Sequence, residues 1–196
     1  NWFGIELANN LQQFVFDLEN GLKPMLIIEA PPQHGKSEAI VDVISWIAGR
    51  NPDLRTIYAS FSERLGVRAN LKLQRLYSKK VYSNIFPETT INTKNVVTGT
   101  NYSRNREILE YVNNDGYFRN TTVQGSITGE SLDLGVIDDP IKGREAANSE
   151  TTRNKTWEWL TDDFFTRFSE EAGFLMILTR WHIDDPAARL IENNKR

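Results

Sequence analysis

The stretch Met25–Ser37, MLIIEAPPQHGKS, decides the fold class of this chain. It opens with the apolar run Met25–Ile28, which prolines bound on both sides. A short run without polar alternation predicts a strand buried on both faces, as in a parallel sheet. From Ser37 to Ala48 apolar residues recur on one helix face, and Gly49 is expected to end that helix. A strand, a compact turn and an amphipathic helix therefore follow one another directly.

The turn resembles a phosphate-binding loop, whose pattern is Gly, four residues and then Gly-Lys-Ser/Thr. Ala30 replaces the first glycine, so the strict pattern fails by one methyl group. Gly35 permits a turn whose N–H groups face phosphate oxygens, as does the positive helix N-terminus. Lys36 is expected to reach the β- and γ-phosphates of ATP, and the Ser37 hydroxyl to bind Mg²⁺. The predicted nucleotide-binding residues are Ala30, Pro31, Pro32, Gln33, His34, Gly35, Lys36 and Ser37. An ordinary strand–turn–helix is the structural alternative.

A second apolar run, Leu132–Ile137, stops at two carboxylates. In nucleotide hydrolases such a strand end carries one acid that holds Mg²⁺ and a second that polarises the attacking water. We assign Asp138 to the metal and Asp139 to the base. The alternative is a turn, because Asp-Asp-Pro starts turns well. The phosphate loop and the acidic pair support each other if they meet at the carboxyl ends of neighbouring parallel strands.

A third buried strand is predicted over 174–178, and Thr179 follows it. In a parallel sheet this hydroxyl faces the phosphate side and can sense the γ-phosphate; capping the next segment is the alternative. His182 is expected to pack or to hydrogen-bond rather than to catalyse. Asp185 is interpreted as the N-cap of a final helix with Pro186 in its first turn. A two-metal nuclease that pairs Asp184 and its neighbour with the first acidic pair is the less favoured reading.

The rest of the chain predicts further alternation of helices and strands. Helices are expected over 1–20, 63–80, 145–168 and 185–193, strands over 55–60 and 132–137, and short strands with loops over 88–125. Gly21 is expected to end the first helix. Buried strands that alternate with helices indicate an α/β fold with a largely parallel sheet.

Composition bounds the class of protein. The chain has 196 residues, a net charge of −3 and no Cys, so it fits one domain without disulfides or Cys-ligated metals. No apolar run approaches the ~20 residues that span a bilayer, so we expect no membrane contact. It begins at Asn1 and carries no signal-peptide pattern, and we expect a processed piece of an intracellular protein.

One segment is strongly basic. Six cations and no acid lie between residues 64 and 80, so the rest of the chain is net acidic. Five of them, at offsets of 4, 4, 3 and 4, are expected on one helix face: Arg64, Arg68, Lys72, Arg75 and Lys79. Because like charges at this spacing repel, the face predicts contact with DNA phosphates or with an acidic neighbouring subunit. A solvated face is the alternative.

Four motifs occur together in this order: APPQHGKS at 30–37, GSITG at 125–129, LGVIDDP at 134–140 and LTRWH at 178–182. Over residues 22–192 they resemble the ATPase domain of the large terminase subunit of tailed bacteriophages. The resemblance implies an α/β, RecA-like, additional-strand P-loop NTPase with a mainly parallel sheet flanked by helices. It also implies a division into an N-terminal helical or lid segment, 1–21, and an ATPase domain, 22–196, with the family's nuclease domain absent.

The resemblance implies a function as well. Large terminases hydrolyse ATP, with Mg²⁺, to translocate double-stranded DNA into a procapsid. Implied partners are DNA, the portal protein, the small terminase subunit and further copies in a ring, commonly of five. The implied location is the cytoplasm of the infected bacterium, at the portal vertex and not in the mature virion. Another translocase or helicase-like ATPase, a small-molecule kinase and a non-catalytic assembly module are the alternatives.

Carried onto this sequence, the family motifs make Lys36 and Ser37 Walker A residues, Asp138 and Asp139 Walker B residues, and Thr179 the coupling residue. Relatives often place an arginine finger where this chain has Gln33, so the finger is expected from elsewhere, including a neighbouring subunit. Candidate donors are Arg104, Arg106, Arg144, Arg153, Arg167 and Arg180, of which Arg180 is grouped with the catalytic residues. Gln12 or Gln13 is the candidate for the adenine site.

Overall fold

The computed structural model describes residues 2–94 and 102–193. Its strands are β1 (Met25–Glu29), β2 (Arg55–Ser60), β3 (Ile108–Glu110), β4 (Tyr117–Thr122), β5 (Leu132–Asp138) and β6 (Phe168–Leu178). Its α-helices are α1 (Trp2–Glu19), α2 (Lys36–Arg50), α3 (Glu63–Tyr77), α4 (Lys80–Ile85), α5 (Gly143–Asn148), α6 (Glu150–Glu158) and α7 (Pro186–Asn193). A π-helical turn, Trp159–Phe164, and a 3-10 turn, Phe165–Arg167, continue α6.

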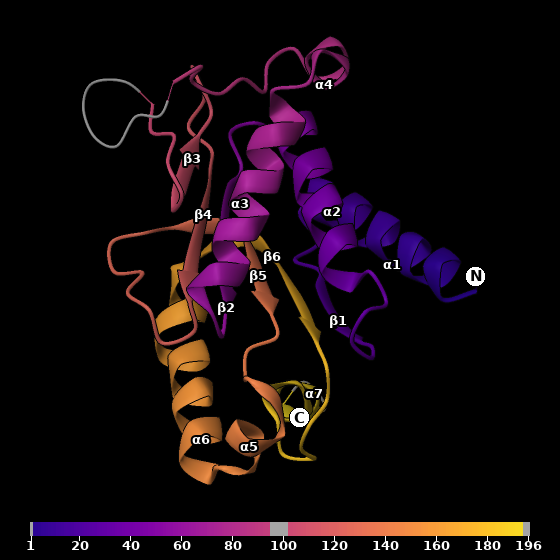
Figure 1. Cartoon of the computed structure of the whole chain (residues 1–196), viewed down its shortest axis with the longest axis vertical. Coiled ribbons are helices and arrows are strands. Elements are labelled where there is room, and N and C mark those ends of the chain that lie inside the picture. Colours follow the sequence, from indigo (N-terminus) through magenta and orange to yellow (C-terminus); the bar gives the residue numbers. More distant parts are fainter. Residues whose placement is uncertain (1, 95–101, 194–196) are drawn as a thin grey trace.

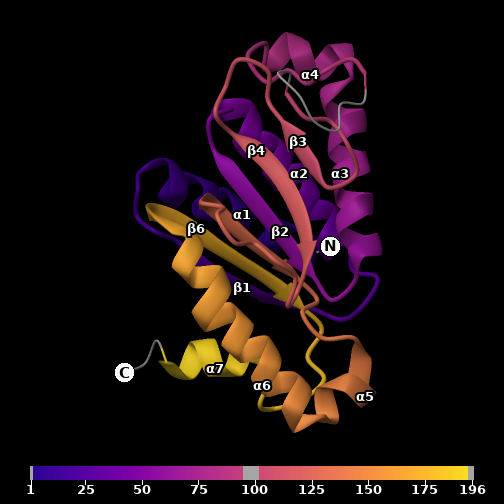
Figure 2. The same ribbon diagram turned by 90° about the vertical axis from the view of Figure 1, so that its left-hand side faces the viewer.

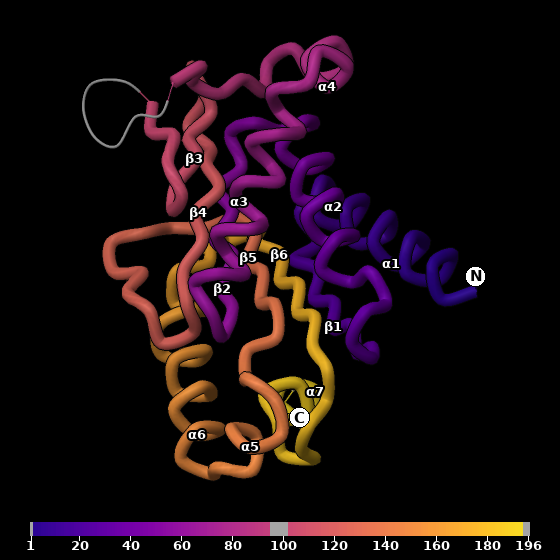
Figure 3. Tube along the Cα trace, in the orientation of Figure 1, coloured from indigo at the N-terminus to yellow at the C-terminus, as the bar shows by residue number. Residues whose placement is uncertain are grey.

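The strands form one sheet in the order β1-β6-β5-β2-β4-β3. All pairs are parallel except β3 with β4, so the predicted α/β fold with a mainly parallel sheet is confirmed. We call the edge at which β1, β5 and β6 end the carboxyl edge; the trace leaves all three strands there, at the bottom of Figures 1 and 3. The opposite edge, where β2 and β5 begin, is the amino edge.

The strand order corrects one prediction. The phosphate loop follows β1 and the acidic pair follows β5, but these strands are not neighbours, because β6 pairs with both of them. The last described strand, β6, is thus inserted between the two that carry the predicted nucleotide-binding motifs. Its carboxyl end brings a third set of side chains between them.

Helices cover both faces of the sheet (Figure 2). One core lies under α1, α2 and α3, and a second lies under α6, its π-helical turn and α7. The alternation of strand side chains explains this division. On β2, Tyr58 enters the first core, whereas Ile57 and Ala59 enter the second.

The prediction that β1 is buried on both faces is confirmed in part: Leu26 packs against the first core and Ile27 against the second, but burial is incomplete. Met25 is 43% exposed, and Ile28, at 8%, is the most deeply buried side chain of the strand. The physical reason is position, because β1 pairs with β6 on one side and forms the end of the sheet. An apolar run this short cannot distinguish an edge strand from a central one.

Two glycines at the ends of predicted helices behave differently. Gly21, at φ +68°, follows α1 as predicted. Gly49 lies inside α2, which continues to Arg50, so its predicted role as helix terminator is wrong. A Cβ on Gly49 would lie 2.6 Å from the Phe86 ring. This glycine therefore permits close packing instead of ending the helix.

Three further boundaries differ from the predictions. The helix expected over 63–80 ends at Tyr77, and a new helix, α4, starts at Lys80. The helical region expected over 145–168 is interrupted at Ser149, whose side chain accepts a hydrogen bond from the Thr152 N–H and caps α6. Its last residue, Phe168, already belongs to β6, which is longer than predicted. The strand over 55–60 is found as predicted.

The first helix packs into the main core. Five of its side chains are buried there: Leu7, Leu11, Phe14, Val15 and Leu18. Near its start, the Phe3 ring meets the His34 ring edge to face at 5.9 Å, so α1 also contacts the phosphate loop. Across the two described ranges, no helix combines the length and the apolarity needed to cross a bilayer.

Candidate nucleotide site

The loop between β1 and α2 has the backbone of an anion-binding turn. Gln33 and Gly35 adopt left-handed conformations at φ +65° and +75°. Gly35 is the N-cap of α2, and no side chain caps that helix end. The first N–H groups of a helix lack intrahelical partners, so this end presents donors and a positive dipole to an anion.

Lys36 joins the ends of three strands. Its side chain is 6% exposed, and its amino group donates hydrogen bonds to the Ala30 carbonyl oxygen at 2.9 Å and to Thr179 Oγ1 at 2.5 Å. The same amino group lies 3.5 Å from Asp139 Oδ1. Ala30 follows β1, Thr179 follows β6 and Asp139 follows β5. A buried ammonium group therefore sits where the three carboxyl ends converge.

Asp138 lies deeper in the site and is 1% exposed. Its Oδ1 accepts a hydrogen bond from Ser37 Oγ at 3.2 Å, and its Oδ2 accepts one from the Tyr58 hydroxyl. Burial raises the pKa of Asp138 to about 6, although the Tyr58 hydrogen bond opposes the shift; the neighbouring charge of Asp139 adds to it. Burial also raises the pKa of Tyr58 well above its usual range, so this hydroxyl remains a donor.

Asp139 turns towards the loop. Its φ of +45° is left-handed, an uncommon conformation outside glycine. Two backbone hydrogen bonds hold it: its N–H donates to the Ile177 carbonyl oxygen in β6 at 2.9 Å, and its carbonyl oxygen accepts from the N–H of Phe61, just after β2, at 3.2 Å. Its Oδ1 accepts from the Thr179 N–H at 2.9 Å. The carboxylate is thereby fixed beside Lys36.

The inserted strand explains the position of Thr179. Because β6 lies between β1 and β5, the residue after its end reaches both motifs at once. The Thr179 hydroxyl is also 3.3 Å from the Ala30 carbonyl oxygen, in addition to its contact with Lys36. The structure thus brings Thr179 together with the two predicted motifs.

The donor set fits a nucleotide with Mg²⁺. A hydroxyl and a carboxylate, from Ser37 and Asp138, are the oxygen ligands that Mg²⁺ takes when phosphates and waters complete its shell. Within residues 2–94 and 102–193, no group of three or more His, Cys, Asp or Glu side chains could hold a metal by itself. The arrangement therefore suits a cation that arrives with phosphate oxygens, beside the ammonium group of Lys36.

Arg180 is engaged within the chain. Its guanidinium lies 3.3 Å from Glu29 Oε1 and donates to Asp185 Oδ2 at 3.0 Å. Glu29 ends β1, and Asp185 is the buried N-cap of α7, so Arg180 links the start of the phosphate loop to the last helix. A guanidinium held by two carboxylates has less freedom to reach a phosphate.

Other candidate arginines differ in their surroundings. Arg153 is buried and donates to Asp184 Oδ2 at 3.1 Å. Arg104 donates to Gln74 Oε1 at 3.1 Å and to the Asn92 carbonyl oxygen. These contacts are structural ones. The exposed candidates are Arg106 and Arg144.

The basic face is smaller than predicted. Lys79 lies beyond the end of α3, so the prediction that it shares this helix face is wrong. Lys72 turns to α2 and lies 2.6 Å from Glu38 Oε2 and 2.8 Å from Asp42 Oδ1, so its charge is used inside the chain. The exposed arginines that remain on α3 are Arg64, Arg68 and Arg75.

The second acidic pair has structural partners. Asp185 Oδ1 accepts from the Ala188 N–H at 2.8 Å, which confirms its prediction as an N-cap. Arg189 donates to both oxygens of Asp184 at 2.6 Å. His182 Nδ1 accepts from the Asp184 N–H at 3.0 Å, so the predicted hydrogen-bonding role of His182 is confirmed.

Sequence reasoning missed Tyr58. It stands in the second predicted strand, RTIYAS, among small and apolar residues, where a tyrosine suggests only packing. Its hydroxyl reaches Asp138 on the neighbouring strand β5, 80 residues away in the sequence. A pattern within one strand could not reveal this contact.

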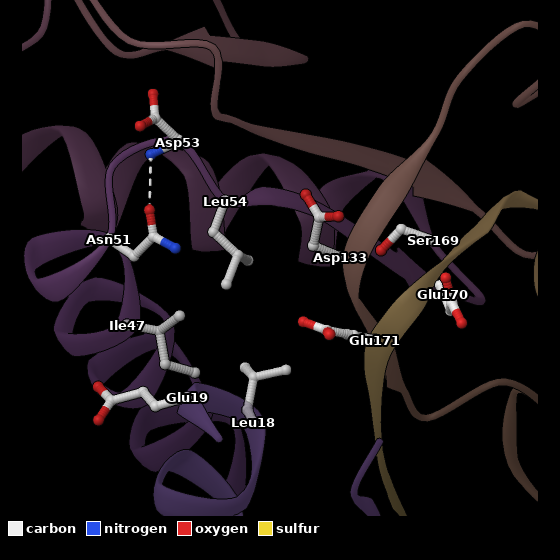
Figure 4. A pocket seen from close by; sticks show the side chains of 10 residues that line it. All are labelled: Leu18, Glu19, Ile47, Asn51, Asp53, Leu54, Asp133, Ser169, Glu170 and Glu171. Carbon is white, nitrogen blue, oxygen red and sulfur yellow. Dashed lines mark hydrogen bonds between the residues drawn. The ribbon is translucent and has the colours of Figure 1, made fainter. Parts of the chain in front are cut away.

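A separate cavity of about 480 Å³ opens at the amino edge (Figure 4). The close-up shows Asp133 and Glu171 pointing into it from β5 and β6, opposite Leu18 and Ile47. Its lining residues are Leu18, Glu19, Ile47, Asn51, Asp53, Leu54, Asp133, Ser169, Glu170 and Glu171. Ligands of open parallel sheets bind at the carboxyl ends of strands, so this cavity lies at the other edge from the candidate site.

The mainly parallel sheet with helices on both faces is a RecA-like α/β fold. The family model described as terminase large subunit, T4likevirus-type, N-terminal, matches residues 27–193, and the chain belongs to this family.

Among solved structures, the large terminase ATPase domain of Thermus phage P74-26 is similar, with a TM-score of 0.54, 16% identity, and coverage of 80% of this chain and 59% of that chain. An arginine-to-alanine mutant of that domain is similar as well, with a TM-score of 0.52, 18% identity, and coverage of 80% of this chain and 59% of that chain. No curated protein matches the chain.

Proposed function

We propose that the chain hydrolyses ATP, with Mg²⁺, to drive translocation of double-stranded viral DNA into a procapsid. The observation that carries this proposal is the Lys36 amino group, held between Ala30, Asp139 and Thr179 at the carboxyl edge. Membership of the large terminase family supports the motor role. The chain spans 59% of the length of the terminase ATPase chains that it resembles, so the activity of a whole motor is part of this proposal.

Each residue of the site has a proposed role. Lys36 and the free N–H groups at the start of α2 bind the β- and γ-phosphates. Ser37 and Asp138 would hold Mg²⁺, which neutralises charge that develops on the phosphates. Asp139 orients the attacking water and takes its proton, and Thr179 senses the γ-phosphate.

The contacts within the chain suggest how nucleotide binding changes the site. In the chain without nucleotide, the Lys36 amino group pairs with the Asp139 carboxylate and donates hydrogen bonds to Ala30 and Thr179. A γ-phosphate competes for the same ammonium group, because its charge-assisted hydrogen bonds are stronger than the neutral ones to Ala30 and Thr179. Asp139 is then released towards water, and Thr179 loses its partner at the end of β6. Occupancy is thereby transmitted to the segment that leads to α7.

The partners follow from the family and from exposed charge. We propose that the exposed arginines of α3, Arg64, Arg68 and Arg75, contact DNA phosphates or an acidic neighbouring subunit. Because Arg180 is engaged by Glu29 and Asp185, we favour a neighbouring subunit as the source of the arginine finger, in a ring that docks on the portal protein with the small terminase subunit. This assembly would work in the cytoplasm of the infected bacterium.

The test of the function is the variant Asp139→Asn. Loss of a general base slows hydrolysis by about 10²–10⁴-fold, whereas ATP binding, measured by fluorescence of a labelled nucleotide, is expected to remain. Asp133→Asn is the matched control, because it makes the same change at the other end of the β5 region and should leave hydrolysis unchanged. Turnover by Asp139→Asn at the wild-type rate would remove Asp139 as the base. Absence of ATP binding by the wild type would overturn the proposed function.

A further inference from the structure

Tyr58 is a buried tyrosine whose hydroxyl contacts the candidate metal-binding carboxylate. The residue is 1% exposed, and its hydroxyl donates to Asp138 Oδ2. Its ring packs into the core under α1, α2 and α3 and lies 6.0 Å from the Phe118 ring. Because the core surrounds the ring, the direction of the hydroxyl is set by packing.

The register of the sheet requires a side chain of this length. β2 and β5 pair so that Ser60 lies opposite Asp138, and Tyr58 lies opposite Val136. Tyr58 is thus two residues before the partner of Asp138, which is ~6.6 Å along the strand. A serine or threonine at this position could not span that distance, and a phenylalanine would bring no donor.

The two oxygens of Asp138 therefore have different surroundings. Oδ2 accepts from Tyr58 in the core, and Oδ1 faces Ser37 Oγ at 3.2 Å, towards the phosphate loop. We propose that Tyr58 is a positioning residue that occupies Oδ2, so that Asp138 meets the nucleotide-bound cation through Oδ1 alone. This inference rests on the proposed function.

The same geometry determines which cation the site prefers. Mg²⁺ requires near-octahedral geometry and keeps several waters, so a carboxylate that offers one oxygen suits it. Ca²⁺ tolerates larger and irregular shells and commonly takes both oxygens of a carboxylate. By holding Oδ2, the Tyr58 hydroxyl opposes bidentate binding and favours Mg²⁺ over Ca²⁺.

The test is binding of a fluorescent ATP analogue to Tyr58→Phe, titrated with Mg²⁺ and, separately, with Ca²⁺. Partners that orient a metal ligand typically contribute 10–100-fold in metal affinity, so the half-saturating Mg²⁺ concentration is expected to rise about tenfold or more. The preference for Mg²⁺ over Ca²⁺ is expected to narrow. Tyr77→Phe is the matched control, because it removes a buried hydroxyl 3.2 Å from the Tyr111 hydroxyl, elsewhere in the core.

A double variant tests whether Tyr58 affects cation binding through Asp138. In an Asp138→Asn background, Tyr58→Phe should change the cation dependence no further, because both act on the same contact. A further loss in that background, or unchanged half-saturation by both cations in Tyr58→Phe alone, would overturn the inference. Wild-type binding of the analogue with Mg²⁺ keeps the proposed function intact in either case. If the wild type does not bind the ATP analogue, the proposed function is overturned, and the inference about Tyr58 with it.

Discussion

Strand β5 carries an aspartate near each end, and the two lie in opposite electrostatic surroundings. Asp133, at the amino edge, receives hydrogen bonds from Arg55 Nε and Nη2, both at 2.8 Å. Partial burial works against ionisation of Asp133, but the hydrogen bonds from Arg55 and Ser169 outweigh it and lower its pKa. Asp138, at the carboxyl edge, has its pKa raised to about 6 by burial.

The difference separates a structural charge from a functional one. At the amino edge an arginine fork satisfies the carboxylate, so ionisation stabilises the fold. At the carboxyl edge the carboxylate is buried beside a second acid, an arrangement that costs stability and is typical of functional sites. Cavities of about 480 and 570 Å³ lie at the amino edge and between α1 and α2, but the carboxylate whose pKa is raised lies at the carboxyl edge. Electrostatics therefore locates the candidate site better than cavity size does.

The largest effect is expected from Lys36→Ala. It removes charge-assisted hydrogen bonds to phosphate of about 1.5–3 kcal/mol each, so nucleotide affinity should fall about 100-fold or more. Titration of a fluorescent nucleotide measures it. Lys155→Ala, a change at an exposed lysine of α6, is the control and should bind normally. If Lys36→Ala bound the nucleotide with near-normal affinity, the carboxyl edge would not hold the anion site. The contrast between a functional carboxyl edge and a structural amino edge would then fail.

Asp138→Asn should stabilise the ligand-free chain at pH 8. The pKa of Asp138, about 6 in the folded chain, exceeds the ordinary 3.8, so the folded state holds its proton more strongly than the unfolded state. Ionisation therefore costs stability as pH rises from about 4 to 6, on the order of 1–3 kcal/mol once complete. Thermal unfolding should show a higher Tm for the variant at pH 8 and a shrinking gain towards pH 5. A lower Tm at pH 8 would contradict this expectation.

Asp133→Asn should lower the stability of the fold, and by less than Asp138→Asn raises it. Loss of the charge-assisted contacts to Arg55 is expected to lower the free energy of unfolding by about 1–2 kcal/mol at pH 7. Because the folded-state pKa is lowered, this stabilisation is present above about 3.8 and lost as pH falls through the folded-state value, so wild type and variant should converge in acid. Chemical denaturation at pH 7 and pH 3 measures the difference. ATP binding should stay unchanged. A weaker ATP affinity of Asp133→Asn would show that the amino edge contributes to the nucleotide site at the carboxyl edge.

The smallest effect is expected from Glu170→Gln in the amino-edge cavity. Glu170 is exposed, and substitutions at such positions usually change stability by less than about 0.5 kcal/mol. Unfolding and ATP hydrolysis should both match the wild type. A shift in Tm above 5 °C would show that this cavity holds a charge-dependent contact and would weaken the contrast between the edges.

Local patterns predicted the units of the site well, because each depends on a few adjacent residues. Gly35-Lys36-Ser37 after a strand, and two acids after another strand, identified both halves of the proposed nucleotide site. Thr179 was expected on the phosphate side because a parallel sheet places all strand ends at one edge. The helix cap at Asp185 was likewise local.

Predictions failed where a residue's environment comes from distant parts of the chain. Gly49 looked like a helix end, but it makes room for Phe86. Lys72 looked like part of an anion-binding face, yet Glu38 and Asp42 of another helix use its charge. The roles of these residues depend on which helices pack together, and that information is spread over the whole chain.

The sequence by itself determined the α/β class, the family and the two motifs that we propose for the nucleotide site, Gly35-Lys36-Ser37 and Asp138-Asp139. Hydrophobic periodicity and turn chemistry act over a few residues, so they can be read along the chain. The tertiary structure alone decided that β6 enters between β1 and β5, that Lys36 contacts Thr179 and Asp139, and that Tyr58 holds Asp138. Strand order and burial are set by the packing of the complete sheet, and burial then sets the charge balance of the site.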